Sequence, residues 1–146
     1  MRDLPRQLSR EELSELFEGD TALVRFLAET DDPLGRAREV ARGLTEEEKL
    51  EALNAHPAIG QRGGLSARSA AEQGAAAHPE VLEELARLNR EYEAKNGFRF
   101  VVFVNRRPKA EILEVLRERI KRPREDELDT AVEELVAIAE NRWRSS

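Results

Sequence analysis

Apolar residues recur every three or four positions along most of the chain, which is the period of an amphipathic α-helix. The pattern predicts helices over about 10–17, 21–29, 34–43, 45–55, 67–77, 81–96, 108–122 and 128–143. No internal repeat, low-complexity stretch or Gly/Ser linker divides the chain. We therefore expect an all-α, single-domain multi-helix bundle that spans residues 1–146.

Short polar motifs mark where several of these helices begin and end. The pattern Ser/Thr-x-x-Glu occurs at 9–12, 45–48 and 69–72. In such a capping box the hydroxyl accepts a hydrogen bond from the N3 amide while the glutamate reaches back to the N-cap amide. Pro57 disfavours the α conformation of the residue before it, so the helix that follows Thr45 must end near Ala55. Asn96-Gly97 suits a helix C-cap.

One segment does not follow the helical period. Residues 98–104, Phe-Arg-Phe-Val-Val-Phe-Val, are β-branched and aromatic, which is typical of a buried strand. Because no second strong strand candidate exists, we expect a short extended segment threaded between helices. Its main-chain N–H and C=O groups have no sheet partner, so side chains or a bound polar ligand must satisfy them.

The composition excludes several classes of protein. Of the 146 residues, 40% are hydrophobic and 37% are charged, and the net charge of −6 argues against a general nucleic-acid binder. There are no cysteines and only two histidines, and no carboxylates have ligand-loop spacing, so we expect no metal site. No apolar run approaches the roughly 18 residues of a membrane span. Neither end carries a secretory or peroxisomal signal, so we expect a cytoplasmic protein.

His56 is the first candidate for acid–base chemistry, because an imidazole exchanges its proton near neutral pH. It lies at a predicted helix end, is followed by Pro57, and precedes a loop that contains three glycines. His78 also precedes a proline, in a predicted surface turn. From the residues alone the two histidines are nearly equal candidates, and His56 could instead be a structural C-cap.

Ser69, Glu72 and Gln73 form a second candidate group in a short, alanine-rich helix. Their spacing is also that of a capping box, which is usually structural. Alanines allow another surface to approach closely, and a carboxylate beside His56 could orient the ring and raise its basicity.

Arg142 is the third candidate. It follows Ile138 by four residues and therefore lies on the same helix face as that apolar residue. An arginine on a core-facing stripe either extends its charged end to solvent or binds an anion. The alternative, which the residues alone favour, is a structural cation near a helix C-terminus.

In their order along the chain these motifs resemble those of a known family. The resemblance is carried by His56-Pro57-x-x-Gly60, Ser69-x-x-Glu72-Gln73, Asn89-x-x-Tyr92-x-x-Lys95-x-Gly97-Phe98-x-Phe100 and Arg142. They are similar to the motifs of the 2-oxo-4-hydroxy-4-carboxy-5-ureidoimidazoline (OHCU) decarboxylase family, which makes (S)-allantoin in urate degradation. The resemblance covers about residues 8–144, and the chain departs from it at Ala58, Asn96 and Arg99, where the family often has Asp, Phe and Pro.

The resemblance implies an all-α carboxy-lyase that needs no cofactor, acts on a small-molecule substrate and forms a homodimer. It implies that His56 and Glu72 are catalytic and that Pro57 holds the histidine. The substrate-binding residues that it implies are Pro57, Ser69, Gln73, Phe100, Val101, Val102 and Arg142, with the Phe100–Val102 stretch acting through its main chain.

Two other functions remain open from the residues. A helical protein-interaction module without catalysis would present an exposed apolar patch. An enzyme of another chemistry, such as a hydrolase, could use His56 and Glu72. The decarboxylase function instead requires His56, Glu72, Gln73 and Arg142 to converge on one small cavity.

Overall fold

The computed structural model describes residues 4–56 and 79–145 of the chain. These residues form seven helices: α1 (Arg10–Leu16), α2 (Ala22–Ala28), α3 (Pro33–Arg42), α4 (Glu46–Asn54), α6 (Pro79–Asn96), α7 (Lys109–Arg119) and α8 (Arg124–Arg144). No strand occurs in either described range. The predicted all-α fold is confirmed, and the prediction that residues 1–146 form one domain stays a prediction.

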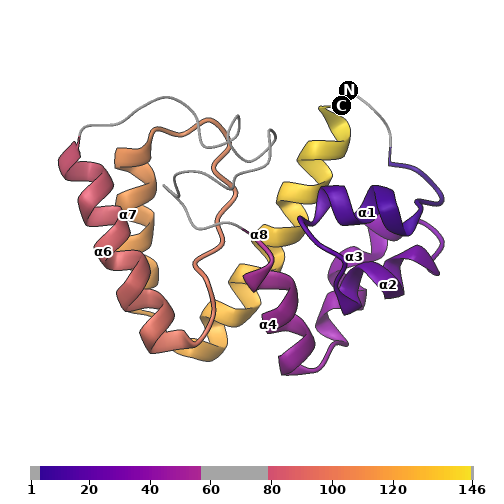
Figure 1. Cartoon of the computed structure of the whole chain (residues 1–146), viewed down its shortest axis with the longest axis horizontal. Helices are drawn as coiled ribbons and strands as arrows, with labels where there is room; N and C mark the ends of the chain where they lie inside the picture. Colours follow the sequence, from indigo (N-terminus) through magenta and orange to yellow (C-terminus); the bar gives the residue numbers. More distant parts are fainter. Residues whose placement is uncertain (1–3, 57–78, 146) are drawn as a thin grey trace.

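The longest helix, α8, crosses the molecule and organises it (Figure 1). Helices α1 to α4 gather in one half of the molecule, and α1, α3 and α4 pack directly against α8. Helices α6 and α7 pair with each other beside its N-terminal half. The extended segment of residues 98–104 leads from α6 toward α7 (Figure 1).

Local signals set several helix boundaries as predicted, whereas α8 begins at Arg124, four residues before its predicted start, and α7 ends at Arg119, three residues before its predicted end. Ser9 and Thr45 are N-caps of α1 and α4, and both capping boxes are complete, with each hydroxyl and each glutamate making its bond. Helix α4 ends at Asn54, with Ala55 as its C-cap. Gly97 follows α6 at a φ of 79°, a left-handed conformation that glycine adopts without steric cost. The third motif, at 69–72, and the predicted helix over 67–77 lie outside the described residues.

Leucine, valine and isoleucine side chains from all seven helices and the extended segment form one core. Helix α8 contributes the residues Leu128, Ala131, Val132, Leu135, Val136, Ile138 and Ala139. Each fully buried large aliphatic side chain stabilises the fold by about 1.5–3 kcal/mol. The core therefore fixes the C-terminal part of α8 against α1 and α4, where two of the candidate site residues lie.

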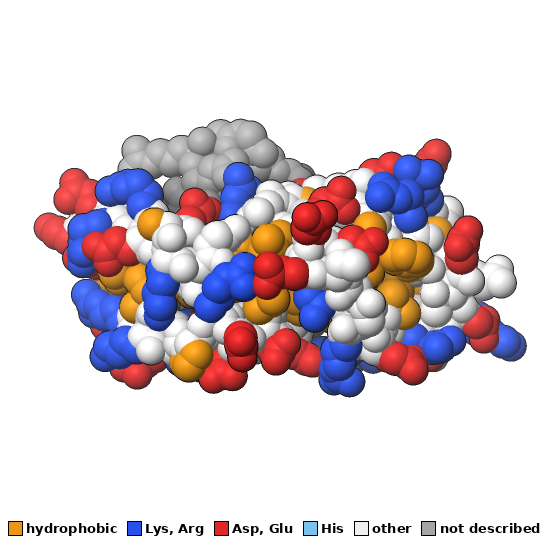
Figure 2. All heavy atoms as spheres, turned by 90° about the horizontal axis from the view of Figure 1, so that it is seen from below, with side chains coloured by type: hydrophobic (Ala, Val, Ile, Leu, Met, Phe, Trp, Pro, Cys, Tyr) orange, Lys and Arg blue, Asp and Glu red, His pale blue; other side chains and the backbone are white. Residues whose placement is uncertain are grey.

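Charged side chains of both signs cover the outside of the molecule. Figure 2 shows them interspersed over one face, with apolar side chains between them. In the two described ranges Phe26 is the one large hydrophobic side chain that is exposed, at 47%. No helix among those same residues is long and apolar enough to cross a bilayer.

Candidate functional site

His56 lies directly after the C-cap of α4 and points inward. Its backbone N–H donates to the Leu53 carbonyl at 3.2 Å, which extends the last turn of the helix. The residue is only 5% exposed, and its Nε2 atom has no hydrogen-bond partner among the described residues. A buried ring nitrogen normally has a partner, so this one is placed to meet a group that the described protein residues do not supply.

The surroundings of His56 keep its ring neutral at pH 7. Burial is the main cause that lowers the pKa of His56 to about 4, because it disfavours the charged form. The cations of Arg142 and Arg99 lower this pKa further, and the carboxylate of Glu18 opposes them. The neutral ring can therefore accept a hydrogen bond near neutral pH.

Arg142 comes from the last turn of α8 and is buried, with 3% of its surface exposed. Its Nη1 atom donates to the main-chain carbonyl of Leu16 at 3.0 Å and pairs with Oε1 of Glu18 at 3.1 Å. The core-facing position that its spacing from Ile138 predicts is thus the observed one. The turn at residues 18 and 19 contacts both Arg142 and Ala55, so His56 and Arg142 lie near each other although they are 86 positions apart in the sequence.

Glu18 is a residue that the sequence patterns did not indicate. It stands in the turn between α1 and α2, and its φ of 62° places it in the left-handed region. Its side chain is 15% exposed and contacts Arg142. Helical periodicity carries no information there, because α1 has already ended at Leu16. A non-glycine residue in this conformation is uncommon and draws attention to the position.

Arg99 joins the extended segment to the end of α4. Its guanidinium donates through Nη1 to the His56 carbonyl, and its Nε lies 3.7 Å from Oε1 of Glu93. Its backbone N–H donates to Oδ1 of Asn54 at 3.0 Å. The chain carries this arginine where the family often has proline, which would supply neither donor.

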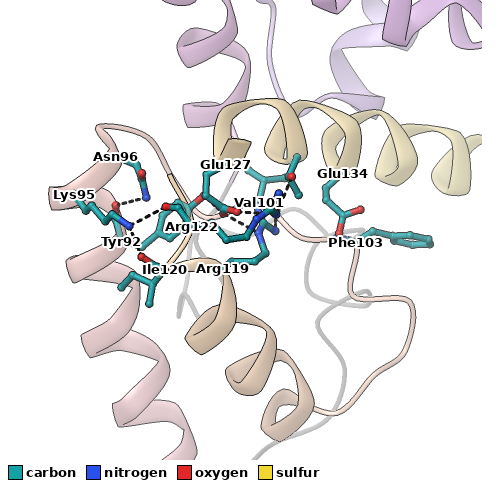
Figure 3. Close-up of polar contacts among 11 residues, drawn as sticks. Tyr92, Lys95, Asn96, Val101, Phe103, Arg119, Ile120, Arg122, Glu127 and Glu134 are labelled. Carbon is teal, nitrogen blue, oxygen red and sulfur yellow. Dashed lines mark hydrogen bonds and ion pairs between the residues drawn. The ribbon is translucent and has the colours of Figure 1, made fainter. Parts of the chain in front are cut away.

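Side chains form hydrogen bonds with part of the main chain of residues 98–104. This is one of the two possibilities that the sequence predicted, the other being a bound polar ligand. Arg119 donates through Nη1 to the Val101 carbonyl at 2.7 Å, and the N–H of Phe103 donates to Oε1 of Glu134 at 3.4 Å (Figure 3). No hydrogen bond from another described residue reaches the main chain of Phe100 or Val102. Those two positions could therefore contact a ligand.

A buried network, which we call the Glu127 network, holds this segment in place (Figure 3). It consists of Tyr92, Arg119, Arg122 and Glu127, from α6, the α7–α8 region and α8. The Glu127 carboxylate accepts from the Tyr92 hydroxyl at 2.6 Å and from Nε of Arg119 at 2.8 Å, and it pairs with Arg122 at 3.0 Å. The Arg119 guanidinium also lies 4.6 Å from the centre of the Phe100 ring. Burial and the bond to Glu127 raise the pKa of Tyr92, so its hydroxyl stays a donor.

The described residues thus bring together part of the predicted site. His56 and Arg142 lie near each other, and Arg99 links His56 to the Phe100–Val102 stretch. Pro57, Ser69, Glu72 and Gln73 lie outside the described residues, as does His78. The described ranges hold no group of three His, Cys, Asp or Glu residues that could bind a metal ion.

Comparisons with known proteins agree on one family. The model of the OHCU decarboxylase family matches residues 2–144. The 2-oxo-4-hydroxy-4-carboxy-5-ureidoimidazoline decarboxylase of Haloferax volcanii is 29% identical over 122 residues, which are 81% of this chain and 73% of that protein. The protein of the same name from Halalkalicoccus jeotgali is 32% identical over 99 residues, covering 65% of this chain and 56% of that protein.

The fold also matches a solved structure. A crystal structure of an OHCU decarboxylase in the presence of (S)-allantoin superimposes with a TM-score of 0.74 and 26% identity. The match covers 90% of this chain and 94% of the other.

Proposed function

The chain belongs to the OHCU decarboxylase family, and from this premise we propose that it converts 2-oxo-4-hydroxy-4-carboxy-5-ureidoimidazoline to (S)-allantoin in urate degradation, without a cofactor. The observation that carries the proposal is the buried His56, whose Nε2 has no partner among the described residues, at the end of a helix that packs against the turn holding the buried Arg142. Cytoplasmic location and a homodimer are part of the same proposal.

The substrate is a small ring with a hydroxyl, a carboxylate and a ureido group. When the bond to the carboxylate breaks and CO₂ leaves, the electron pair stays on the ring, delocalises and then takes a proton on one face. A catalyst gains most by stabilising the charge that develops in this step. It also determines which face receives the proton, and this sets the configuration of the product.

His56 is the acid–base residue in this proposal. Because it is neutral near pH 7, it can accept a proton from the hydroxyl side of the substrate at Nε2. It can then return a proton to one face of the ring. A positioned acid–base group contributes about 10²–10⁴-fold to the rate.

Arg142 would contact a ring oxygen or the ureido group, where negative charge accumulates. A guanidinium bound to the leaving carboxylate would instead stabilise the ground state and slow the loss of CO₂. We assign Glu72 to hold His56 or the ureido N–H groups and Pro57 to hold the histidine. Ser69, Gln73 and the main chain of Phe100, Val101 and Val102 complete the substrate contacts.

The test is to produce the unstable ureidoimidazoline from urate with the two preceding enzymes of the pathway and to follow circular dichroism. With the protein present, the signal of (S)-allantoin should appear faster than substrate decays unaided, while the control without it should give product of low optical activity. Racemic product at the unaided rate would refute the proposal.

A matched pair of variants tests the role of His56. His56→Ala should lower the rate by about 10²–10⁴-fold with its helical spectrum unchanged. His78→Ala, the same substitution at the only other histidine, should keep the wild-type rate. A folded and fully active His56→Ala variant would show that another group moves the proton.

No observation favours the interaction-module function over this one. That function needs a contiguous exposed apolar patch. In the described ranges Phe26 is the one exposed large hydrophobic side chain.

A further inference from the structure

Two segments that are distant in sequence meet at Arg142. Its Nη1 atom is contacted by the Leu16 carbonyl, at the end of α1, and by the Glu18 carboxylate two residues later. The two distances, 3.0 and 3.1 Å, are those of hydrogen bonds. Two oxygens on one nitrogen fix the plane of a guanidinium, because its N–H groups have a rigid fork geometry.

The turn that carries Glu18 is also packed against the residue before His56. A Cβ atom built on Gly19 would lie 3.2 Å from the Cβ of Ala55, so a larger residue there would force the two segments apart. The position of the Glu18 carboxylate is therefore tied to the end of α4. The turn connects the catalytic histidine and the arginine to one rigid support.

Glu18 is one of four described non-glycine residues with a positive φ, and its side chain pairs with a buried cation. Its φ of 62° is a conformation in which side-chain-bearing residues are disfavoured and glycine is not. Residues held in such conformations cluster at functional sites. Here a carboxylate occupies the position and points at a buried cation.

The charges around His56 also connect Glu18 with the candidate site. Its charged neighbours are Arg142 from α8, Arg99 from the extended segment and Glu18 from the turn after α1. Of these three residues only Glu18 is acidic, and it raises the pKa of His56 whereas the two arginines lower it. Arg99 in turn lies 3.7 Å from Glu93 of α6.

We propose that Glu18 is a positioning residue for the decarboxylation: with the Leu16 carbonyl it fixes the Nη1 edge of Arg142 and so holds the guanidinium in one orientation beside His56. The assignment rests on the proposed function. Pairing with Glu18 also reduces the net positive charge that would hold the leaving carboxylate in the ground state.

The test compares Glu18→Gln and Glu18→Gly with the wild type, in kcat, KM, pH profile and melting temperature. Both variants should lower kcat by about 10–100-fold, because a small misplacement of a substrate-orienting group costs that much. KM should stay near the wild-type value or fall, since losing a negative charge does not weaken the attraction of an anionic substrate. In Glu18→Gln the acid limb of the pH profile should move to lower pH.

Glu18→Gly separates positioning from folding. Glycine relieves the left-handed backbone and therefore offsets part of the stability that is lost with the ion pair to the buried Arg142. A purely structural role predicts instead that the folded fraction of Glu18→Gly keeps the wild-type kcat, whatever its melting temperature. That result would overturn the assignment.

Two control variants test whether the loss of kcat is specific to Glu18. Glu15→Gln removes the same charge from an exposed position of α1, and Asn105→Gly relieves another left-handed residue, at a φ of 48°. Both should keep wild-type kcat. An active wild type with fully active Glu18 variants would overturn this assignment alone, whereas an inactive wild type would overturn the proposed function and the assignment with it.

Discussion

The end of the bundle that holds His56 and the end that holds the Glu127 network each bury a titratable side chain. The charges that surround the two side chains differ. Glu127 is completely buried, and its carboxylate meets two arginines and a tyrosine hydroxyl. His56 is nearly as buried, yet two cations act on it and its Nε2 has no partner among the described residues. Buried atoms without a hydrogen-bond partner occur at both ends, at Nε2 of His56 and at Oε2 of Glu127 and Nη2 of Arg119. What distinguishes the His56 end is the charge around its titratable group, because cations oppose the ionised form of His56 and compensate that of Glu127.

The largest effect on stability should come from breaking the Glu127 network. Glu127→Ala leaves Arg119, which is 6% exposed, without its carboxylate. Removing one partner of a buried pair typically costs about 3–5 kcal/mol. Urea unfolding should show this loss, while the rate per folded molecule stays within the range of the wild type.

The matched control is Glu133→Ala on the same helix. Glu133 also contacts two arginines, Arg38 at 2.9 Å and Arg42 at 3.2 Å, but its side chain is 43% exposed. Exposed pairs contribute at most about 1 kcal/mol. If Glu127→Ala were stable but inactive, the Glu127 network would belong to the chemistry and the comparison would be wrong.

A smaller effect on the free energy of unfolding should come from lowering the pH, because His56 is buried in its neutral form. His56 has a pKa of about 4 in the folded protein and 6.5 ordinarily, so between these values the unfolded chain binds a proton that the folded protein does not. Stability therefore falls as pH is lowered through this window. From pH 7 to pH 5 the contribution of His56 is a loss of about 2 kcal/mol.

Urea unfolding of the wild type and of His56→Gln at both pH values measures this contribution. The wild type should lose about 2 kcal/mol more than the variant on going to pH 5. Equal losses would mean that His56 is not buried in its neutral form, and the contrast with the Glu127 network would disappear.

Local signals explain how much of this molecule could be predicted from the sequence. The capping boxes at Ser9 and Thr45 act within four residues, so the helix starts follow directly from the chain. The aromatic and β-branched run at 98–104 indicates an extended segment for the same reason. The i, i+4 spacing from Ile138 places Arg142 on the buried face of α8.

Long-range pairing explains what could not be predicted. Glu127 meets Tyr92 across 35 positions, and nothing in the period of either helix marks the two as partners. Glu18 lies in a turn, where no periodicity applies, and its partner Arg142 is at the other end of the chain. The proposed roles of His56 and Arg142 rest on the resemblance to a family, because each residue also fits a structural role.

The smallest effect on stability should come from a hydrogen bond that joins the extended segment to α4. In this bond the Arg99 N–H donates to Oδ1 of Asn54 at 3.0 Å. Arg99→Ala keeps this N–H and loses the guanidinium, whereas Arg99→Pro, the residue that the family often has, loses both. Asn54→Ala should therefore cost about 0.5–1.5 kcal/mol more in the alanine background than in the proline background, measured by urea unfolding. Equal costs would show that Asn54 does not join the extended segment to α4, and that His56 is held there by the Arg99 side chain alone.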